Sequence, residues 1–84
     1  MRIVNSLGLH ARPAAKFVKI AGRYQCHIAV RKDEEMEVNG KSIMGVLTLA
    51  AECGSKLQLR ADGADAEQAV GELMELVQAG FGED

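Results

Sequence analysis

The stretch GLHARPA, residues 8–14, sets a histidine directly in front of a helix, and the rest of the chain can be interpreted outward from it. From His10 onward, apolar residues recur at helical spacing, and Gly22 follows as a stop. Pro13 at the third helical position is compatible with this helix, because the first N–H groups of a helix have no partner within it. The residues expected in the core are Ala14, Phe17, Val18 and Ala21.

Strand and helix patterns alternate along the rest of the chain. Residues 2–5 form a short apolar segment, residues 24–31 alternate as a half-buried strand, and residues 35–38 pair with that strand through a charged turn. Ser42 is a good N-cap for the apolar run 43–51, residues 57–61 alternate again, and residues 65–79 form a last helix that ends before Gly80. The order βαββαβα predicts an α+β domain with helices over one side of an antiparallel sheet.

Length and charge limit the classes of function. The 84 residues suit one domain, residues 1–84, which is too small to enclose a large substrate. Residues 1–32 hold seven of the ten Lys and Arg and no Asp or Glu, whereas all twelve acidic residues lie beyond residue 32. This segregation indicates either an oppositely charged partner or two oppositely charged elements packed together. Without a signal-peptide pattern or a long apolar run, we expect a cytoplasmic protein that does not insert into membranes.

The cysteines and histidines do not form a metal-site pattern. Cys26 and Cys53 lack CxxC spacing, and neither His10 nor His27 stands at ligand distance from them along the chain. We therefore expect two reduced, buried thiols, no metal and no cofactor. His27 falls on the polar face of its strand. Two Phe and one Tyr leave little aromatic surface for base stacking, so nucleic acid is not an expected partner.

The surroundings of His10 favour phosphoryl chemistry. A histidine at the N-cap has the backbone N–H groups of Ala11 and Arg12 beside it, at the positive end of the helix dipole, where anions bind. The guanidinium of Arg12 matches phosphate oxygens. The loop contains no acidic base and no serine nucleophile, and the chain has no nucleotide-binding glycine loop. These residues could hold a phosphoryl group without making or using one alone, which favours a carrier over an enzyme.

At these residues the chain resembles the HPr family, the histidine-containing phosphocarriers of the bacterial phosphotransferase system. The resemblance extends over almost the whole chain and rests on GLHARPA, on KSIMGV at residues 41–46, on GFGE at residues 80–83 and on the order of elements. It implies an open-faced β-sandwich, a four-stranded antiparallel sheet with three helices on one side. It also implies a protein that has no turnover of its own.

The resemblance assigns roles to individual residues. His10 would accept a phosphoryl group on Nδ1 from phospho-Enzyme I and pass it to an Enzyme IIA component, and Arg12 would be the active-centre arginine. Ser42 would match the serine that a kinase, with its phosphorylase, modifies in some bacteria. Leu7 stands where many members carry a small polar residue, and leucine there is similar to the nitrogen-branch relatives. The sugar and nitrogen branches therefore both stay open.

Two surfaces are candidates for partner binding. Arg12, Lys16, Lys19 and Arg23 form one basic stripe along the first helix, which either faces a partner or is neutralised by Glu67, Glu72 and Glu75. On the middle helix we expect Val46, Leu49 and Ala50 in the core. An exposed patch would lie next to His10 if the two helix starts share one edge. The expected partner-contacting residues are Leu9, Lys16, Lys19, Ile43, Met44 and Leu47, in a monomer.

Other functions remain as alternatives. A regulatory binding module would act through phosphorylated Ser42 on a transcription factor or metabolic enzyme, and Ser42 could equally be a helix cap alone. A nitrogen-branch relative would serve a regulatory phosphorelay instead of sugar uptake. A small phosphatase with His10 as nucleophile would need a water-activating base, which the loop lacks.

Overall fold

A computed structural model describes residues 2–4, 8, 10–49 and 51–82 of the chain. Its elements are α1 (Ala11–Ala21), β1 (His27–Lys32), β2 (Val38–Asn39), α2 (Ile43–Thr48), β3 (Leu57–Asp62), α3 (Ala66–Gln78) and a 3₁₀ turn, η1 (Gly80–Gly82). The α+β content and the predicted order from the first helix onward are confirmed, and α1 begins directly after His10 and ends before Gly22.

The sheet has three strands among the described residues, where four were expected. Its order is β2-β1-β3, with both pairs antiparallel and Ala29 of β1 opposite both Asn39 and Arg60. The predicted first strand makes one isolated bridge, Arg2 opposite Lys56, and Asn5 lies outside the described residues. The physical reason is register: Arg2 meets the residue in front of β3, so Ile3 continues along the turn that precedes β3 and not along β3 itself.

The strand expected at residues 35–38 is shorter than predicted. Asp33 adopts a left-handed φ of 53°, and the N–H of Glu35 donates to the Lys32 carbonyl at 3.0 Å, so the chain turns here instead of pairing. Only Val38 of the predicted segment belongs to β2. Met36, which lies in the part of this segment that does not pair, is 87% exposed.

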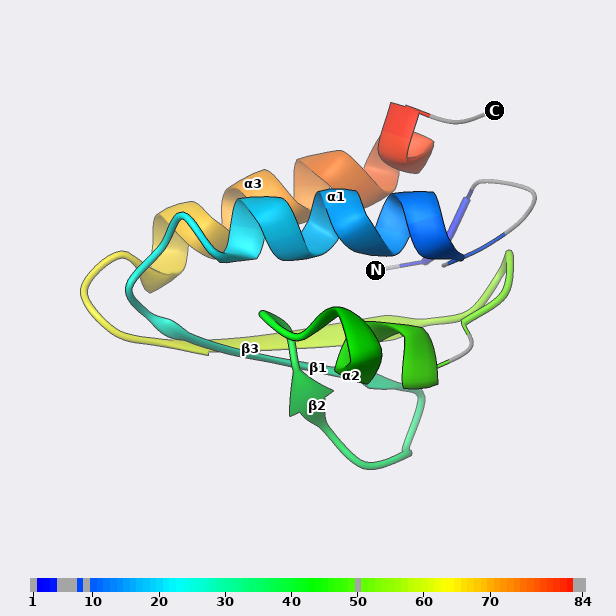
Figure 1. Cartoon of the computed structure of the whole chain (residues 1–84), viewed down its shortest axis with the longest axis horizontal. Helices are drawn as coiled ribbons and strands as arrows, with labels where there is room; N and C mark the ends of the chain where they lie inside the picture. The colour runs from blue at the N-terminus through cyan, green and yellow to red at the C-terminus, as the bar shows by residue number, and fades with distance from the viewer. Residues whose placement is uncertain (1, 5–7, 9, 50, 83–84) are drawn as a thin grey trace.

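The helices and the sheet enclose one core. Figure 1 shows α1 and α3 side by side over the sheet, and side chains from all three helices join the same buried cluster. The α3 residues Ala69, Leu73 and Val77 are buried, whereas Val70 is only half-buried and lies outside the cluster. The largest fully buried side chains include Phe17, Phe81, Ile3, Ile28, Leu57, Leu73 and Val46.

The start of α3 is tied by Asp65 to the segment that leads from α1 into β1. Its carboxylate oxygens accept the backbone N–H groups of Gln25 and Cys26, each at 2.9 Å. These hydrogen bonds, from Gln25 first, hold the pKa of Asp65 below its ordinary value. Cys26 is buried as expected, whereas Cys53 is exposed in the loop before β3, which corrects the prediction of two buried thiols.

Asp65→Asn should make the protein less stable at neutral pH and less sensitive to acid. Because the folded pKa of Asp65 is lowered, its contribution to stability is complete above the unfolded value, about 3.9, and is lost as pH falls toward the folded value. Thermal unfolding followed by circular dichroism at about pH 7 and about pH 3 should show a smaller difference for the variant than for the wild type. Glu34→Gln, in the exposed turn, is the matched control; equal pH dependence in the two variants would contradict the assignment.

Candidate phosphoryl-acceptor site

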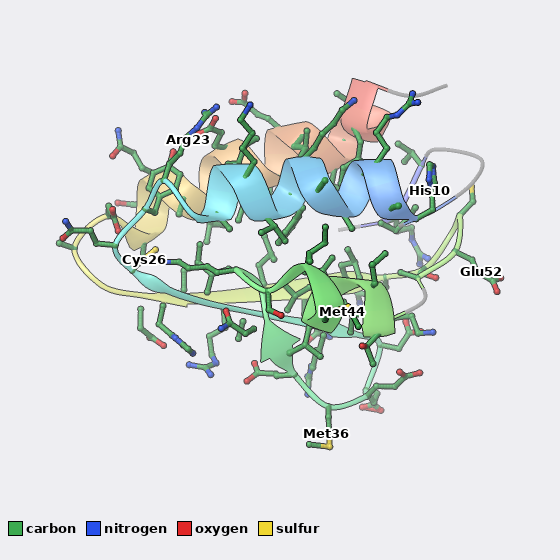
Figure 2. All side chains as sticks on the ribbon, in the orientation of Figure 1. His10, Arg23, Cys26, Met36, Met44 and Glu52 are labelled. Carbon is green, nitrogen blue, oxygen red and sulfur yellow. The ribbon has the colours of Figure 1, made fainter. Side chains whose placement is uncertain are left out.

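His10 is the N-cap of α1, as predicted. Its backbone is extended, with φ −93° and ψ −166°, and its carbonyl accepts the N–H of Ala14 at 2.9 Å in the first hydrogen bond of the helix. Its own N–H donates to the Gly8 carbonyl at 3.1 Å. Figure 2 shows His10 at the end of α1, where the side chain is partly exposed while its Nε2 atom is buried. Of the two ring nitrogens, Nε2 is therefore one that the fold covers.

The first turn of α1 is suited to an anion. The backbone amides of Ala11 and Arg12 precede the first hydrogen bond within the helix, and both residues are exposed. No acidic residue occupies this turn, so the positive end of the helix dipole is not neutralised from within the helix. Pro13 is buried at the third helical position, where its missing N–H costs nothing. The three predicted site residues, His10, Ala11 and Arg12, thus lie together.

Gly8 fixes the loop that carries His10. It adopts a left-handed φ of +71°, and a Cβ atom placed on it would lie 2.5 Å from the Ala51 carbonyl oxygen and 2.8 Å from the Cα of Glu52. Residues 51–52 follow α2, so the end of α2, and not its start, lies beside the His10 loop. The contact with this loop is thus made by the segment after α2, whereas a patch next to His10 was expected only if the two helix starts shared one edge. Leu7 and Leu9 lie outside the described residues.

Ser42 caps α2 as predicted. Its Oγ accepts the N–H of Gly45 at 3.1 Å, and its own N–H donates to the Asn39 carbonyl at 3.1 Å. The side chain is partly exposed. Ser42 therefore acts as the N-cap of α2 through its hydroxyl oxygen, and its side chain remains partly exposed.

The predicted patch on α2 is only partly exposed. Met44 is 71% exposed and Ile43 42% exposed, whereas Leu47 is half-buried and packs against the core. Val46 and Leu49 are buried as expected, and Ala50 lies outside the described residues. The exposed apolar surface of α2 thus consists of Ile43 and Met44, and Leu47 adds only the part of its side chain that is not buried.

The basic stripe on α1 is divided between two roles. Arg23 pairs with Glu72 of α3 at 3.3 Å, so the far end of the stripe is neutralised as the alternative reading held. Lys16 donates its Nζ proton to the Phe81 carbonyl at 2.6 Å. Lys19 is exposed and forms no ion pair with another described residue. The stripe is therefore split: Arg23 is neutralised by α3, Lys16 holds the C-terminal turn, and Lys19 is exposed.

The structural role of the turn that follows α3 was not predicted. Phe81 is buried with a left-handed φ of 59°, between Gly80 and Gly82, and its carbonyl receives Lys16 from α1. The GFG sequence was the available signal, because two glycines around an aromatic residue indicate an unusual backbone.

Among the described residues no cluster of His, Cys, Asp or Glu could hold a metal ion, and no helix is long and apolar enough to cross a membrane.

Gly8→Ala should destabilise the protein and slow phosphoryl acceptance. The added methyl group would clash with the Ala51 carbonyl in a backbone conformation that favours glycine, at a cost of ~1–3 kcal/mol. Gly54→Ala is the matched control, because Gly54 also has a positive φ, of 92°, but has open space around a Cβ. Chemical denaturation and labelling kinetics should show a larger defect in Gly8→Ala; equal defects would mean that the close contact is unimportant.

Comparisons with known proteins agree with this geometry. A family model described as "PTS HPr component phosphorylation site" matches residues 1–79. The chain is 49% identical over 81 residues to the phosphocarrier protein HPr of Pseudomonas aeruginosa, covering 96% of this chain and 90% of the relative. It is 43% identical to HPr of Treponema pallidum over 84 residues, covering 100% and 94%.

The solved structures give the same result. The crystal structure of HPr-C-His from Thermoanaerobacter tengcongensis superposes with a TM-score of 0.93 at 44% identity, covering 100% of this chain and 93% of the other. That of Crh, the Bacillus subtilis catabolite repression protein, superposes with a TM-score of 0.78 at 37% identity, covering 93% and 88%. The chain therefore belongs to the HPr family, the phosphocarrier component of the phosphotransferase system.

Proposed function

We propose that His10 is the residue of this phosphocarrier that holds the phosphoryl group, on Nδ1. The observation that carries the proposal is the buried Nε2 of a partly exposed histidine at a helix N-cap. A neutral imidazole nitrogen would attack phosphorus, a P–N bond would form, and the donor atom would leave with the electron pair of its own bond to phosphorus. The phosphoryl oxygens would then lie near the amides of Ala11 and Arg12 and near the Arg12 guanidinium.

The proposed partners are Enzyme I as donor and an Enzyme IIA component as acceptor. They would approach over the start of α1, along the helix surface that carries Lys16 and, in the last turn, Lys19, and over Ile43 and Met44 of α2. Contact between α1 and α2 supports this choice of surface. We also propose that residues 1–84 act as one cytoplasmic domain. We expect a monomer, although one related structure is described as an HPr dimer from Thermoanaerobacter tengcongensis.

His10→Ala should abolish labelling by Enzyme I and radioactive phosphoenolpyruvate, because it removes the accepting nitrogen. Arg12→Ala should retain labelling at a rate lowered on the order of 100-fold, the typical effect of losing one donor to developing charge. His27→Ala is the matched control, since His27 is the other histidine and is exposed on β1. Full labelling of His10→Ala, or its loss in His27→Ala, would contradict the assignment.

A second, regulatory function is supported by the position of Ser42. Phosphorylation would place about two negative charges at the start of α2, next to the exposed Ile43 and Met44. A helix start tolerates this charge, whereas an acidic partner surface would be repelled.

A kinase with its phosphorylase would control the switch, and phosphorylated Ser42 could also bind regulatory proteins. The relative Crh carries catabolite repression in its name, which is consistent with such a role in this fold.

Ser42 variants should separate capping from charge. Ser42→Ala loses the bond to Gly45 and should cost ~0.5–2 kcal/mol of stability with a near-normal labelling rate. Ser42→Asp keeps a capping oxygen, so it should be more stable than Ser42→Ala yet slower to accept phosphate. Gln58→Glu, which adds the same charge on β3, is the control and should label normally. Equal rates for all three variants would exclude a charge switch at Ser42.

A further inference from the structure

The sheet face that points away from the core carries a row of polar and charged side chains. Along β3, Leu57 is buried, whereas Gln58 and Arg60 are exposed, so alternate residues project from the outer face. On β1, Arg31 lies opposite Gln58, and its Nε donates to the Gln58 Oε1 at 2.8 Å. Arg31 therefore belongs to this outer face.

Two further cations continue the row in front of β3. Lys56 precedes the buried Leu57, so its side chain points outward like that of Gln58, and it is exposed. Arg2 pairs with Lys56 in the isolated bridge, while its neighbour Ile3 is in the core. Residues paired across strands direct their side chains to one face of a sheet, so Arg2 and Lys56 stand side by side on the outer face.

Arg2, Arg31 and Lys56, here called the basic cluster, are charges without a counterion. None of them forms an ion pair with another residue in the described part of the chain. The Arg31 guanidinium is held by the neutral amide oxygen of Gln58, and that of Arg2 donates to the Gly54 carbonyl at 3.0 Å. These neutral acceptors orient the two guanidinium groups without cancelling their charge, and each group has further N–H donors to offer.

This arrangement costs energy that a bound anion would relieve. Like charges directly opposite each other destabilise a sheet, and Arg2 and Lys56 are such a pair. The acids nearby do not remove the cost: Asp33 has no ion pair with a described residue, and both carboxylate oxygens of Glu37 bind Arg60. Even with the neighbouring Asp33 carboxylate, the three cations keep a positive surplus, which favours an anion of high charge.

The spacing of the basic cluster favours two linked phosphate groups. Arg31 lies opposite Gln58, and Lys56 stands two residues before Gln58, so Arg31 and Lys56 are diagonal neighbours, about 7–8 Å apart. A guanidinium fork fits phosphate oxygens, and an ammonium adds a point charge. A single phosphate would reach Arg31 or the Arg2–Lys56 pair, whereas two linked phosphates can reach both.

The basic cluster offers nothing to a nucleotide base. The chain has no Trp, and its aromatic side chains other than histidine are Phe17, Phe81 and Tyr24. Both Phe side chains are buried, and Tyr24 lies between α1 and β1, where its hydroxyl donates to Glu72. An inorganic ligand is therefore favoured over a nucleotide.

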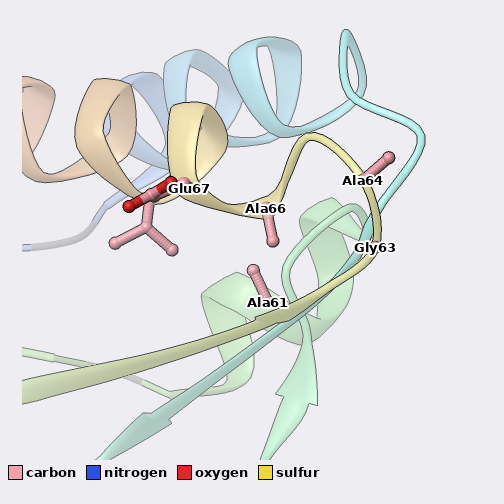
Figure 3. A pocket seen from close by; sticks show the side chains of 6 residues that line it. Ala61, Gly63, Ala64, Ala66 and Glu67 are labelled. Atoms are coloured by element: carbon pink, nitrogen blue, oxygen red, sulfur yellow. The ribbon is translucent and has the colours of Figure 1, made fainter.

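The pocket beside α3 is unsuited to the same ligand. Figure 3 shows it where β3 leads into α3, lined by Ala61, Gly63, Ala64, Ala66, Glu67 and Val70. Glu67 is the charged member of this lining, and a carboxylate repels an anion. The pocket therefore serves as an internal negative control.

We propose that the basic cluster binds inorganic pyrophosphate. Arg31 holds one phosphate group, Arg2 and Lys56 hold the other, and the repulsion between Arg2 and Lys56 is relieved. The site lies on the outer face of the sheet, whereas His10 begins α1, which covers the opposite face in Figure 1. Binding here is therefore separate from phosphoryl transfer at His10.

Titration of pyrophosphate into the isotope-labelled protein, in metal-free buffer and followed by NMR, tests the site. The amide signals of Arg31 and Lys56 should shift along one binding curve, and that of Ala66, at the pocket, should not move. Orthophosphate and sulfate should bind about tenfold more weakly, because each reaches only one end of the basic cluster. ADP should bind no more tightly than pyrophosphate, because its base has no partner.

Variants test the individual contacts. Arg31→Gln and Lys56→Gln should each weaken pyrophosphate binding about tenfold. Gln58→Glu should also weaken it, because it keeps an acceptor for the Arg31 Nε but adds a neutralising carboxylate. Arg23→Gln is the matched control, since it removes the same charge beyond α1 and should leave the affinity unchanged. All four variants should label normally at His10, which separates this proposal from the phosphocarrier function.

Four results would overturn the proposal. Unmoved Arg31 and Lys56 signals at saturating pyrophosphate would exclude the site, and equal affinity for sulfate and pyrophosphate would show a general attraction for anions. Shifts that accompany those of Ala11 and disappear in Arg12→Ala would place the anion at the start of α1. Tighter binding of ADP than of pyrophosphate would make the ligand a nucleotide.

Discussion

The close contact between Gly8 and residues 51–52 is the constraint on which the site depends. His10 stands two residues after Gly8, and its N–H bonds to the Gly8 carbonyl, so the position of the loop against Ala51 sets where the imidazole lies. A backbone-to-backbone contact of this kind is rigid, since neither side can move a side chain out of the way. The contact also joins the loop before α1 to the segment after α2. The two helices that form the proposed partner surface are therefore held in one arrangement.

The far side of α1 is held by the C-terminal turn. Phe81 is buried in a left-handed backbone conformation, and its carbonyl accepts the Lys16 ammonium. Lys16, a member of the basic stripe on α1, thereby has a structural role. Arg23 is used in the same way by Glu72. The charge segregation of the sequence thus has a structural consequence: Glu72 of the acidic last helix pairs with Arg23, just beyond the end of α1 that is far from His10.

The sequence was sufficient for features that depend on neighbouring residues. The start of α1 at His10, the cap of α2 by Ser42 and the extent of β3 follow from local spacing and capping. Features that depend on distant partners were missed. Nothing near Arg2 in the sequence indicates that it pairs with Lys56, in front of β3, and the alternation around Met36 does not reveal that the chain turns away before β2 forms.

The burial of apolar residues also depends on partners that are distant in the sequence. An apolar residue on a short helix can face the core or a partner, and only the packing of α2 against α1 places Leu47 partly inside and Met44 outside. Val70 is the opposite case: it fits the helical stripe of α3, yet it lies outside the core cluster and lines a pocket at the start of α3. Apolar spacing therefore identifies the face of a helix that packs, and only the fold decides which residues of that face are fully buried.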